Sequence, residues 1–395
     1  MRMADLHRST CPMSTTIQAA SNSSSLTYAR ARLWTGISGV GTAVLLASLA
    51  LLLDLPQRWS GGVEPTLVPE ALALLAWFGV WALVTLPFDL LGGYVLPRSF
   101  GREHSTIGAH LLSIARGASV LALVGTASGL VLLTAARTGG LPLLAVAFGA
   151  LSVALAALQL PAARAIGGLA TAGRTLPTEL KNDVWLEASD PGFTGGLVAA
   201  TGRSVWPARW LDELNAEQLG ALAARRREVN AGGARLRGFL VAVAFNTAGF
   251  TLMAAWIPGG GETVASLLSI ATAWILWSFA GLLVLPAFSR AATRAIDRRR
   301  REDIAHLESA WTKLDQLQDG EPERTAGLES VFHPVRAVSG RVRDLNRDQS
   351  ETGVGAWHVA RYALWLSHVG LSPLGRLVHC NAGRPELWAF LPSDG

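Results

Sequence analysis

The chain has little charge, little lysine and little cysteine, and each shortage excludes a class of protein. Charged residues make up 16% of the 395 residues, and half are hydrophobic. Soluble domains carry about 25% charged residues, so one large soluble core is not expected. The two cysteines, Cys11 and Cys380, cannot build a disulfide framework or a cysteine-based zinc knuckle. The only lysines are Lys181 and Lys313, so arginine supplies the net charge of +5. We interpret this as a composition bias and expect no nucleic-acid partner.

What the chain does contain is a series of apolar segments separated by arginine-bearing loops. Each segment is long enough to cross a bilayer core of about 30 Å at 1.5 Å per residue. The sequence therefore predicts a mainly α, polytopic membrane protein with six transmembrane helices, in contact with membrane lipids. These spans are expected at Trp34–Leu53, Glu70–Leu91, Gly117–Ala136, Leu141–Leu160, Gly238–Ile257 and Val264–Phe288.

The arginines alternate between the two sides of the predicted spans. They are frequent before the first span, around residues 98–116, in 161–237 and after residue 289, whereas the intervening loops hold only Arg58 and Arg137. Basic loops stay in the cytoplasm, so we expect both termini on the cytoplasmic side of a bacterial inner membrane. No signal peptide is evident.

The same alternation divides the chain into parts. Two cytoplasmic stretches are expected to form one small α+β domain, which a transmembrane hairpin interrupts. The predicted parts are a disordered tail (1–32), four transmembrane helices (33–160), the first part of the domain (161–237), the hairpin (238–288), the second part of the domain (289–350) and an amphipathic region rich in Trp and His (351–395).

Local patterns predict the elements of the interrupted domain. Alternating residues indicate a strand at 183–188, a turn follows at 190–192, and residues 197–206 suit a hairpin. Asn215 is expected to cap a helix that ends near Asn230. Further helices are predicted from Ser289 to about Gln318, at 341–346, and at 359–371, the last one lying on the membrane or on the domain surface.

Three stretches of this order carry a family resemblance: 217–224, 289–297, and 332–334 followed by 341–345. Together they resemble the membrane zinc metalloproteases of the HtpX and CAAX-prenyl-protease family. In that family a helix carries H-E-x-x-H, a transmembrane hairpin follows, the next helix carries E-x-x-A-D, and a T-H-P turn comes later. Two histidines and the third-ligand glutamate hold zinc there, and the glutamate of the first motif is the general base.

This chain departs from the family at every position that carries the chemistry. The histidine positions fall on Arg225 and Val229, the general base falls on Arg226, and the third ligand falls on Thr293, whereas Asp297 keeps the family's supporting aspartate. Arginine stays protonated and has no lone pair to donate to a metal. The resemblance therefore implies the scaffold of a zinc peptidase without catalytic residues and without the zinc cofactor.

The sequence leaves three interpretations of the run Arg225, Arg226 and Arg227. It is a solvated or lipid-facing basic patch, a site for an anionic ligand or partner, or a salt-bridged element that replaces zinc, with Asp297 or Glu228 as the counter-charge. His333, in the stretch that resembles the T-H-P turn, is interpreted as a turn residue or a binding residue.

Three functions remain open at this point. The favoured one is an inactive, metalloprotease-like protein that binds or regulates a membrane protein, a peptide segment or an active relative, using the strand near 195–200. The second is an active membrane hydrolase with a relocated site built from Asp297, His306, His333 and the His379–Cys380 group. The third is a transporter or channel that uses Asp89 and Arg116, which are expected near the inner ends of their spans.

Overall fold

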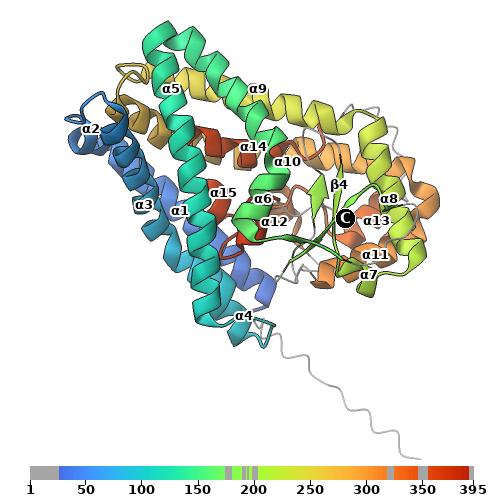
Figure 1. Cartoon of the computed structure of the whole chain (residues 1–395). Helices are drawn as coiled ribbons and strands as arrows, with labels where there is room; N and C mark the ends of the chain where they lie inside the picture. The colour runs from blue at the N-terminus through green and yellow to red at the C-terminus, as the bar shows by residue number, and fades with distance from the viewer. Residues whose placement is uncertain are drawn as a thin grey trace, which may run out of the picture.

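The structure is a computed structural model, and it describes residues 26–173, 180–188, 193, 195–197, 203–317, 324–345 and 355–390. Within these residues, five helices are long and apolar enough to cross a membrane (Figure 1). The prediction of a mainly helical chain with several candidate membrane-spanning helices is confirmed at this level. The five are α1 (Tyr28–Leu52), α3 (Leu67–Leu90), α5 (Ile107–Ala157), α9 (Ala234–Trp256) and α10 (Val264–Arg299).

Helix α5 contains two of the predicted spans and breaks between them. Gly140 has φ 58° and ψ −154°, which lies outside helical geometry, and Pro142 follows it closely. A positive φ suits glycine because it has no Cβ. Figure 1 shows the chain turning over at the far end of α5 and returning toward α6 (Gln159–Gly167). The segments 117–136 and 141–160 therefore lie mainly in two arms of this bent helix.

Three connections gather at the end of the bundle remote from the small domain. Arg137, just before the break in α5, forms an ion pair with Glu70 at the start of α3. Its Nε also donates a hydrogen bond to the Glu262 carbonyl, 2.7 Å away, in the loop before α10. The short helix α2 (Leu55–Ser60) packs against α10. The loops that the arginine pattern assigns to one side of the membrane therefore do meet.

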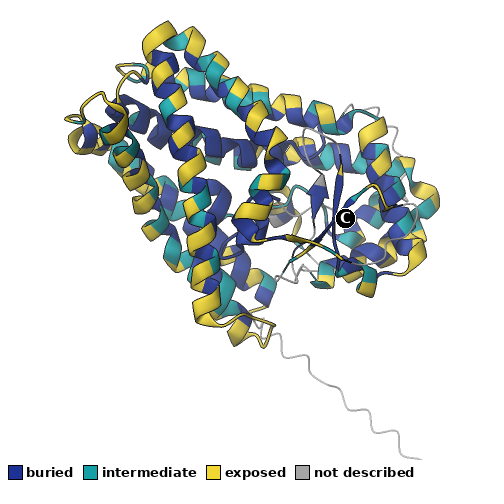
Figure 2. Ribbon diagram, viewed as in Figure 1, coloured by how far each residue is buried: buried dark blue, intermediate teal, exposed yellow. Residues whose placement is uncertain are grey.

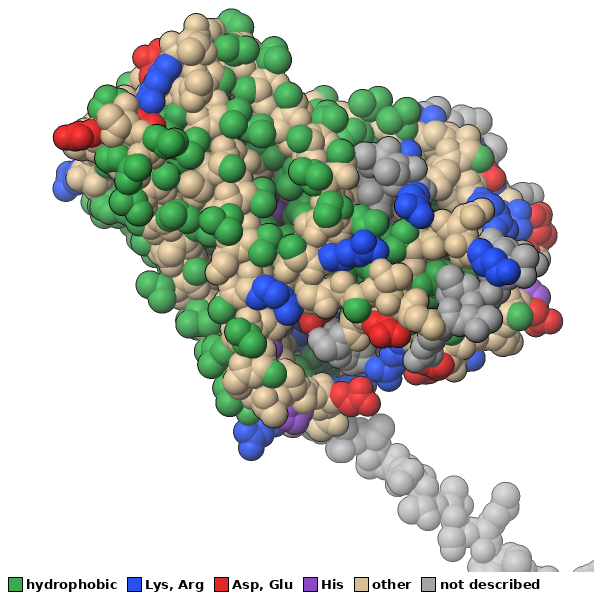
Figure 3. Space-filling model, in the orientation of Figure 1, with side chains coloured by type: hydrophobic (Ala, Val, Ile, Leu, Met, Phe, Trp, Pro, Cys, Tyr) green, Lys and Arg blue, Asp and Glu red, His purple; other side chains and the backbone are tan. Residues whose placement is uncertain are grey.

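The surface of the bundle is apolar. Large hydrophobic side chains such as Leu83, Leu123 and Leu252 are exposed on α3, α5 and α9, and green side chains spread over this part of Figure 3. Trp34, Trp59 and Trp256 are exposed, whereas Trp77 is buried. Apolar patches of this extent are rare on soluble monomers, which agrees with the membrane-spanning length of these helices.

The small domain contains a four-stranded sheet with the order β1-β2-β4-β3. Strands β2 (Val184–Glu187) and β4 (Ser204–Pro207) are parallel, and the two-residue strands β1 (Ala170–Thr171) and β3 (Gly196–Leu197) pair antiparallel at the edges. The predicted strand at 183–188 is observed at Val184–Glu187. Strands β3 and β4 pair antiparallel, as the predicted hairpin over 197–206 requires, with Leu197 opposite Ser204. The predicted turn at 190–192 and residues 198–202 of the hairpin lie outside the described residues.

Helices from both halves of the chain complete this domain. Asn215 caps α8 through a reciprocal capping box with Gln218, as its position predicted. Tryptophans from the sheet, α7 and α11 form the centre of the core. The helices are α7 (Trp210–Glu213), α8 (Ala216–Ala231), α11 (Ile304–Leu317), α12 (Ala326–Phe332) and α13 (Val338–Leu345).

The predicted helix from Ser289 to Gln318 is wrong in its boundaries. Span six and the start of that helix form one element, since α10 runs from Val264 to Arg299 with Pro286 inside it. The helix instead breaks at Arg300, which has φ −112° and ψ 30°. A 3-10 turn at Arg301–Asp303 then leads into α11.

Two calls about the ends of the chain are also corrected. The tail was expected to reach residue 32, but Thr27 caps α1 and the helix includes Arg32, whose side chain is buried; residues 1–25 lie outside the described residues. The segment at 359–371 was expected on a surface. It forms α14 (Val359–Leu366) and a 3-10 turn (Ser367–Gly370), followed by α15 (Leu374–Leu377), all buried (Figure 2).

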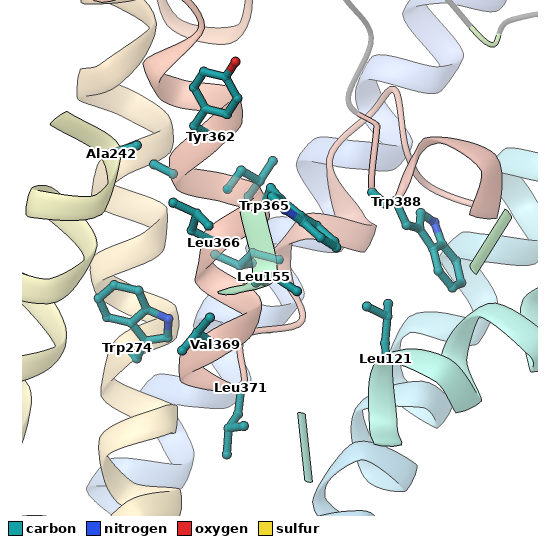
Figure 4. Packing of buried hydrophobic residues seen from close by; sticks show 14 of the residues in the cluster. Leu121, Leu155, Ala242, Trp274, Tyr362, Trp365, Leu366, Val369, Leu371 and Trp388 are labelled. Atoms are coloured by element: carbon teal, nitrogen blue, oxygen red, sulfur yellow. The ribbon is translucent and has the colours of Figure 1, made fainter. Parts of the chain in front are cut away.

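The segment is buried because it is apolar on most sides, and such a helix must be covered all round. Tyr362, Trp365, Leu366 and Val369 belong to the main hydrophobic core together with residues of α5, α9 and α10 (Figure 4). In Figure 1 this red segment passes between α1, α9 and α10. The prediction that residues 359–371 lie on a surface is therefore wrong, because this short apolar segment lies in the interior of the bundle.

Candidate functional site

The arginine run of α8 splits into two buried side chains and one exposed one. Arg225 and Arg226 are 0% and 2% exposed, whereas Arg227 faces outward. Successive residues of an α-helix point about 100° apart, so a run of three cannot share one environment. A solvated basic patch is therefore a fair description of Arg227 alone.

Arg225 belongs to a buried ion cluster centred on Asp297 of α10. Its Nε lies 2.7 Å from Asp297 Oδ1. Arg341 of α13 contributes two further contacts, from Nε to Oδ2 at 2.8 Å and from one terminal nitrogen to Oδ1 at 2.9 Å. The guanidinium of Arg341 also stacks over Trp311 of α11, 3.3 Å from the ring centroid. One carboxylate thereby connects both parts of the interrupted domain.

Arg226 binds the sheet instead. One terminal nitrogen donates a hydrogen bond to the Val205 carbonyl of β4 at 2.9 Å. Its guanidinium lies 3.8 Å from the centroid of Trp206 and 5.2 Å from that of Trp210. Planar guanidinium groups favour such stacking on aromatic faces. Arg226 therefore ties α8 to the sheet and the tryptophan core.

The remaining positions singled out by the resemblance lie at the same α8–α10 interface. Val229 is fully buried in a cluster with Ala292 and Ile296 of α10. The Thr293 hydroxyl, one turn before Asp297, donates to the Ser289 carbonyl of its own helix at 3.0 Å. The sequence thus identified positions that the fold brings to one interface.

These residues do not fit a zinc ion. Two permanently charged guanidinium groups stand at ligand and base positions, and a valine at another. The described residues contain no group of three His, Cys, Asp or Glu side chains placed to hold a metal. Of the three interpretations of the run, the one that the contacts match for Arg225 is the ion pair with Asp297. Glu228, the other suggested counter-charge, instead pairs with Arg299 at 2.9 Å.

The candidate residues for a relocated enzyme site are dispersed among separate contacts. His306 is exposed and faces Glu217 at 3.6 Å, and Asp297 is held by arginines. The ring of His333 contacts that of His379, with centroids 5.3 Å apart, and the His333 carbonyl accepts a hydrogen bond from Arg290. Burial, the neighbouring His379 and nearby arginines lower the pKa of His333 to about 2, so its ring is neutral at pH 7.

Asp89 and Arg116, the residues considered for a transport path, do not pair with each other. Asp89 is fully buried in α3, where Oδ2 lies 2.6 Å from a terminal nitrogen of Arg376 and Oδ1 accepts the Gly383 N–H at 2.9 Å. Arg116 instead donates to the Ile166 carbonyl and to Ser113. Asp89 lies near the end of α3, and its partner comes from residues 356–390.

Sequence reasoning missed Arg341 and Arg376, the arginines that complete these two clusters. Arg341 lies in the stretch that resembles the helix after the T-H-P turn, so that resemblance was the available signal. No local pattern marks Arg376, which lies 287 residues from Asp89. No protein-family model matches the chain, and no curated protein matches it.

Proposed function

We propose that this chain is a non-catalytic membrane protein that retains a metalloprotease-like scaffold and binds a membrane-protein or peptide segment without cleaving it. The observation that carries the proposal is the pairing of Arg225 and Arg341 with Asp297. A buried carboxylate held by two guanidinium groups stands at the interface where the resemblance puts a metal centre. The domain is therefore closed by an ion cluster instead of by zinc.

The membrane arrangement that suits this proposal has six crossings, with α5 contributing two of them through its break at Gly140. The domain and both termini then lie on the cytoplasmic side of the inner membrane. Support comes from exposed arginines such as Arg98, Arg116 and Arg164, because basic residues favour the cytoplasmic side and its anionic lipids. Figure 3 shows basic side chains between the apolar bundle and the domain.

The proposal is tested by reconstituting the full chain in liposomes and incubating it with an unfolded protein substrate, with and without a metal chelator. We expect no cleavage above that of empty liposomes. Chelator-sensitive cleavage that copurifies with the protein would overturn the proposal.

A further inference from the structure

Residues 356–390 occupy the interior of the helix bundle as a ligand would. Only Arg361 and residues 378–380 in this stretch are less than fully buried. The segment contacts α1, α3, α5, α9 and α10, and Figure 4 shows its side chains packed among residues of the surrounding helices. Helices from the whole length of the bundle region therefore surround this stretch.

The surrounding helices hold this segment by apolar packing of its side chains and by hydrogen bonds to its main chain. Side chains from five helices donate hydrogen bonds to its backbone carbonyls. Main-chain recognition of this kind tolerates many sequences, as in other peptide-binding sites. The donors and their acceptor residues are Arg32 of α1 to His379 at 2.8 Å, Trp77 of α3 to Leu371 at 3.4 Å, Gln159 of α6 to Ala389 at 3.0 Å, Asn246 of α9 to Ala363 at 2.9 Å and Trp274 of α10 to Ser367 at 3.1 Å.

Glycines on the surrounding helices let the segment's backbone come close. A Cβ atom added to Gly36 of α1 would lie 2.5 Å from the backbone nitrogen of His379. One added to Gly238 of α9 would lie 1.9 Å from the Trp357 carbonyl oxygen. Such contacts exclude any larger residue at these two positions. The walls of the site are thus shaped around a main chain.

One contact recognises a charged side chain of the segment. Asp89 binds Arg376, and the same guanidinium lies 4.1 Å from the centroid of Trp388. Asp89 also accepts the Gly383 N–H, which fixes the carboxylate in place. A buried carboxylate without a cation is expensive, so this position selects strongly for an arginine.

We propose that the interior of the bundle is a peptide-binding site whose resident ligand is residues 356–390, and that Asp89 selects partners carrying an arginine. The partner class is a short apolar helix of about two turns, like α14, followed by an arginine that reaches Asp89. This inference rests on the proposed function, since it names the site and the ligand of a protein that binds without cleaving. The resident segment inhibits the site until a competing peptide displaces it.

The test uses the full chain with Cys11→Ser, so that Cys380 is its only thiol. The competitor is a synthetic peptide with the sequence of residues 356–390, in which serine replaces Cys380. A second peptide also carries Arg376→Gln. In excess, the arginine peptide is expected to raise the rate of Cys380 alkylation by a maleimide at least tenfold, because it displaces the resident segment. The glutamine peptide is expected to change that rate less than twofold. Equal effects of the two peptides, or no effect of either, would overturn the inference.

A variant chain sharpens the test. When the chain carries Arg376→Gln, its own segment competes poorly for the site around Asp89. We therefore expect this chain to bind the arginine peptide, now labelled with a fluorophore, at least tenfold more tightly than the unmodified chain does. Arg227→Ala is the control and should leave peptide affinity unchanged. The alkylation test uses a chain that keeps Arg376, so it still tests the inference if the Arg376→Gln chain fails to fold. Failure of peptide exchange would remove this inference alone, whereas chelator-sensitive cleavage of the peptide would overturn the proposed function.

Discussion

Two buried aspartates, Asp297 in the domain and Asp89 in the bundle, are held in similar ways but connect different elements of the fold. Each binds arginine, and in each cluster an arginine stacks on a tryptophan, Arg341 on Trp311 and Arg376 on Trp388. Asp297 joins helices α8, α10 and α13, and α10 also packs against each of the other two. Asp89 joins α3 to a segment that is otherwise held by apolar packing and by hydrogen bonds to its backbone.

The difference indicates what each charge does. Asp297 receives three charge-assisted contacts from two arginines, and it closes a domain whose two parts are far apart in sequence. Asp89 has one arginine and one backbone N–H, both from residues 356–390. Loss of the first is therefore expected to destabilise the domain, and loss of the second to loosen the inserted segment.

The largest effect is expected from Asp297→Asn. This change leaves two buried arginines without their shared carboxylate, and removing one partner of a buried ion pair costs about 3–5 kcal/mol. We expect the upper end of that range, measured as a fall in the thermal midpoint of the detergent-purified protein. Cys380 alkylation in the folded variant should stay at the rate of the unmodified chain.

The control for this change is Asp303→Asn. Asp303 pairs with Arg300 at a partly exposed position, where an ion pair contributes at most about 1 kcal/mol. Equal destabilisation by the two substitutions would mean that the Asp297 cluster has no special weight.

Asp89→Asn is expected to rank second, with a loss of about 3 kcal/mol because one buried arginine loses its partner. Its distinguishing readout is the alkylation of Cys380, which should accelerate in this variant and not in Asp297→Asn. If both variants exposed the thiol equally, the two clusters would not be independent.

A smaller effect is expected from Arg226→Met, which keeps the apolar stem and removes the guanidinium. The variant loses a hydrogen bond to Val205 and the stacking on Trp206, together worth about 2 kcal/mol. Arg227→Ala, one residue further on and exposed, should change stability by less than about 0.5 kcal/mol. Chemical denaturation of the two variants measures the contrast.

The smallest expected effect is a pH dependence from His333. Its pKa falls from 6.5 to about 2 on folding, so below pH 6.5 the unfolded chain takes up a proton that the folded chain does not. Stability is then unaffected above that pH and declines as the pH falls toward 2, by about 1 kcal/mol between pH 6.5 and 5.5. His333→Gln should reduce this decline in thermal melts, and His306→Gln, at an exposed position, should not.

Sequence reasoning went furthest where information is local or periodic. Hydrophobic runs located the long helices, and Asn215 with Gln218 marked the start of α8. Flanking motifs placed Arg225, Val229 and Thr293 at one interface, although no pattern decided between solvent and an ion pair for the arginines. Whether these arginines face solvent or form an ion pair depends on the surroundings of Asp297, which Arg341 reaches only in the folded domain.

Long-range partners explain the remaining misses. The partner of Asp89 was missed because that arginine, Arg376, lies 287 residues away. Residues 359–371 looked amphipathic because a short apolar segment gives no sign of whether lipid or protein covers it. Both misses have one cause, which is the insertion of residues 356–390 into the bundle. No local sequence pattern predicts that insertion.

The central claim is that arginines paired with Asp297 stand in place of a metal centre, and zinc content tests it most directly. Elemental analysis of the detergent-purified full chain, with a chelator-washed control, is predicted to find no stoichiometric zinc, while Asp297→Asn lowers the thermal midpoint in buffers with and without zinc. About one zinc per chain that survives washing, with a thermal midpoint that falls when stronger chelation removes it, would contradict the account.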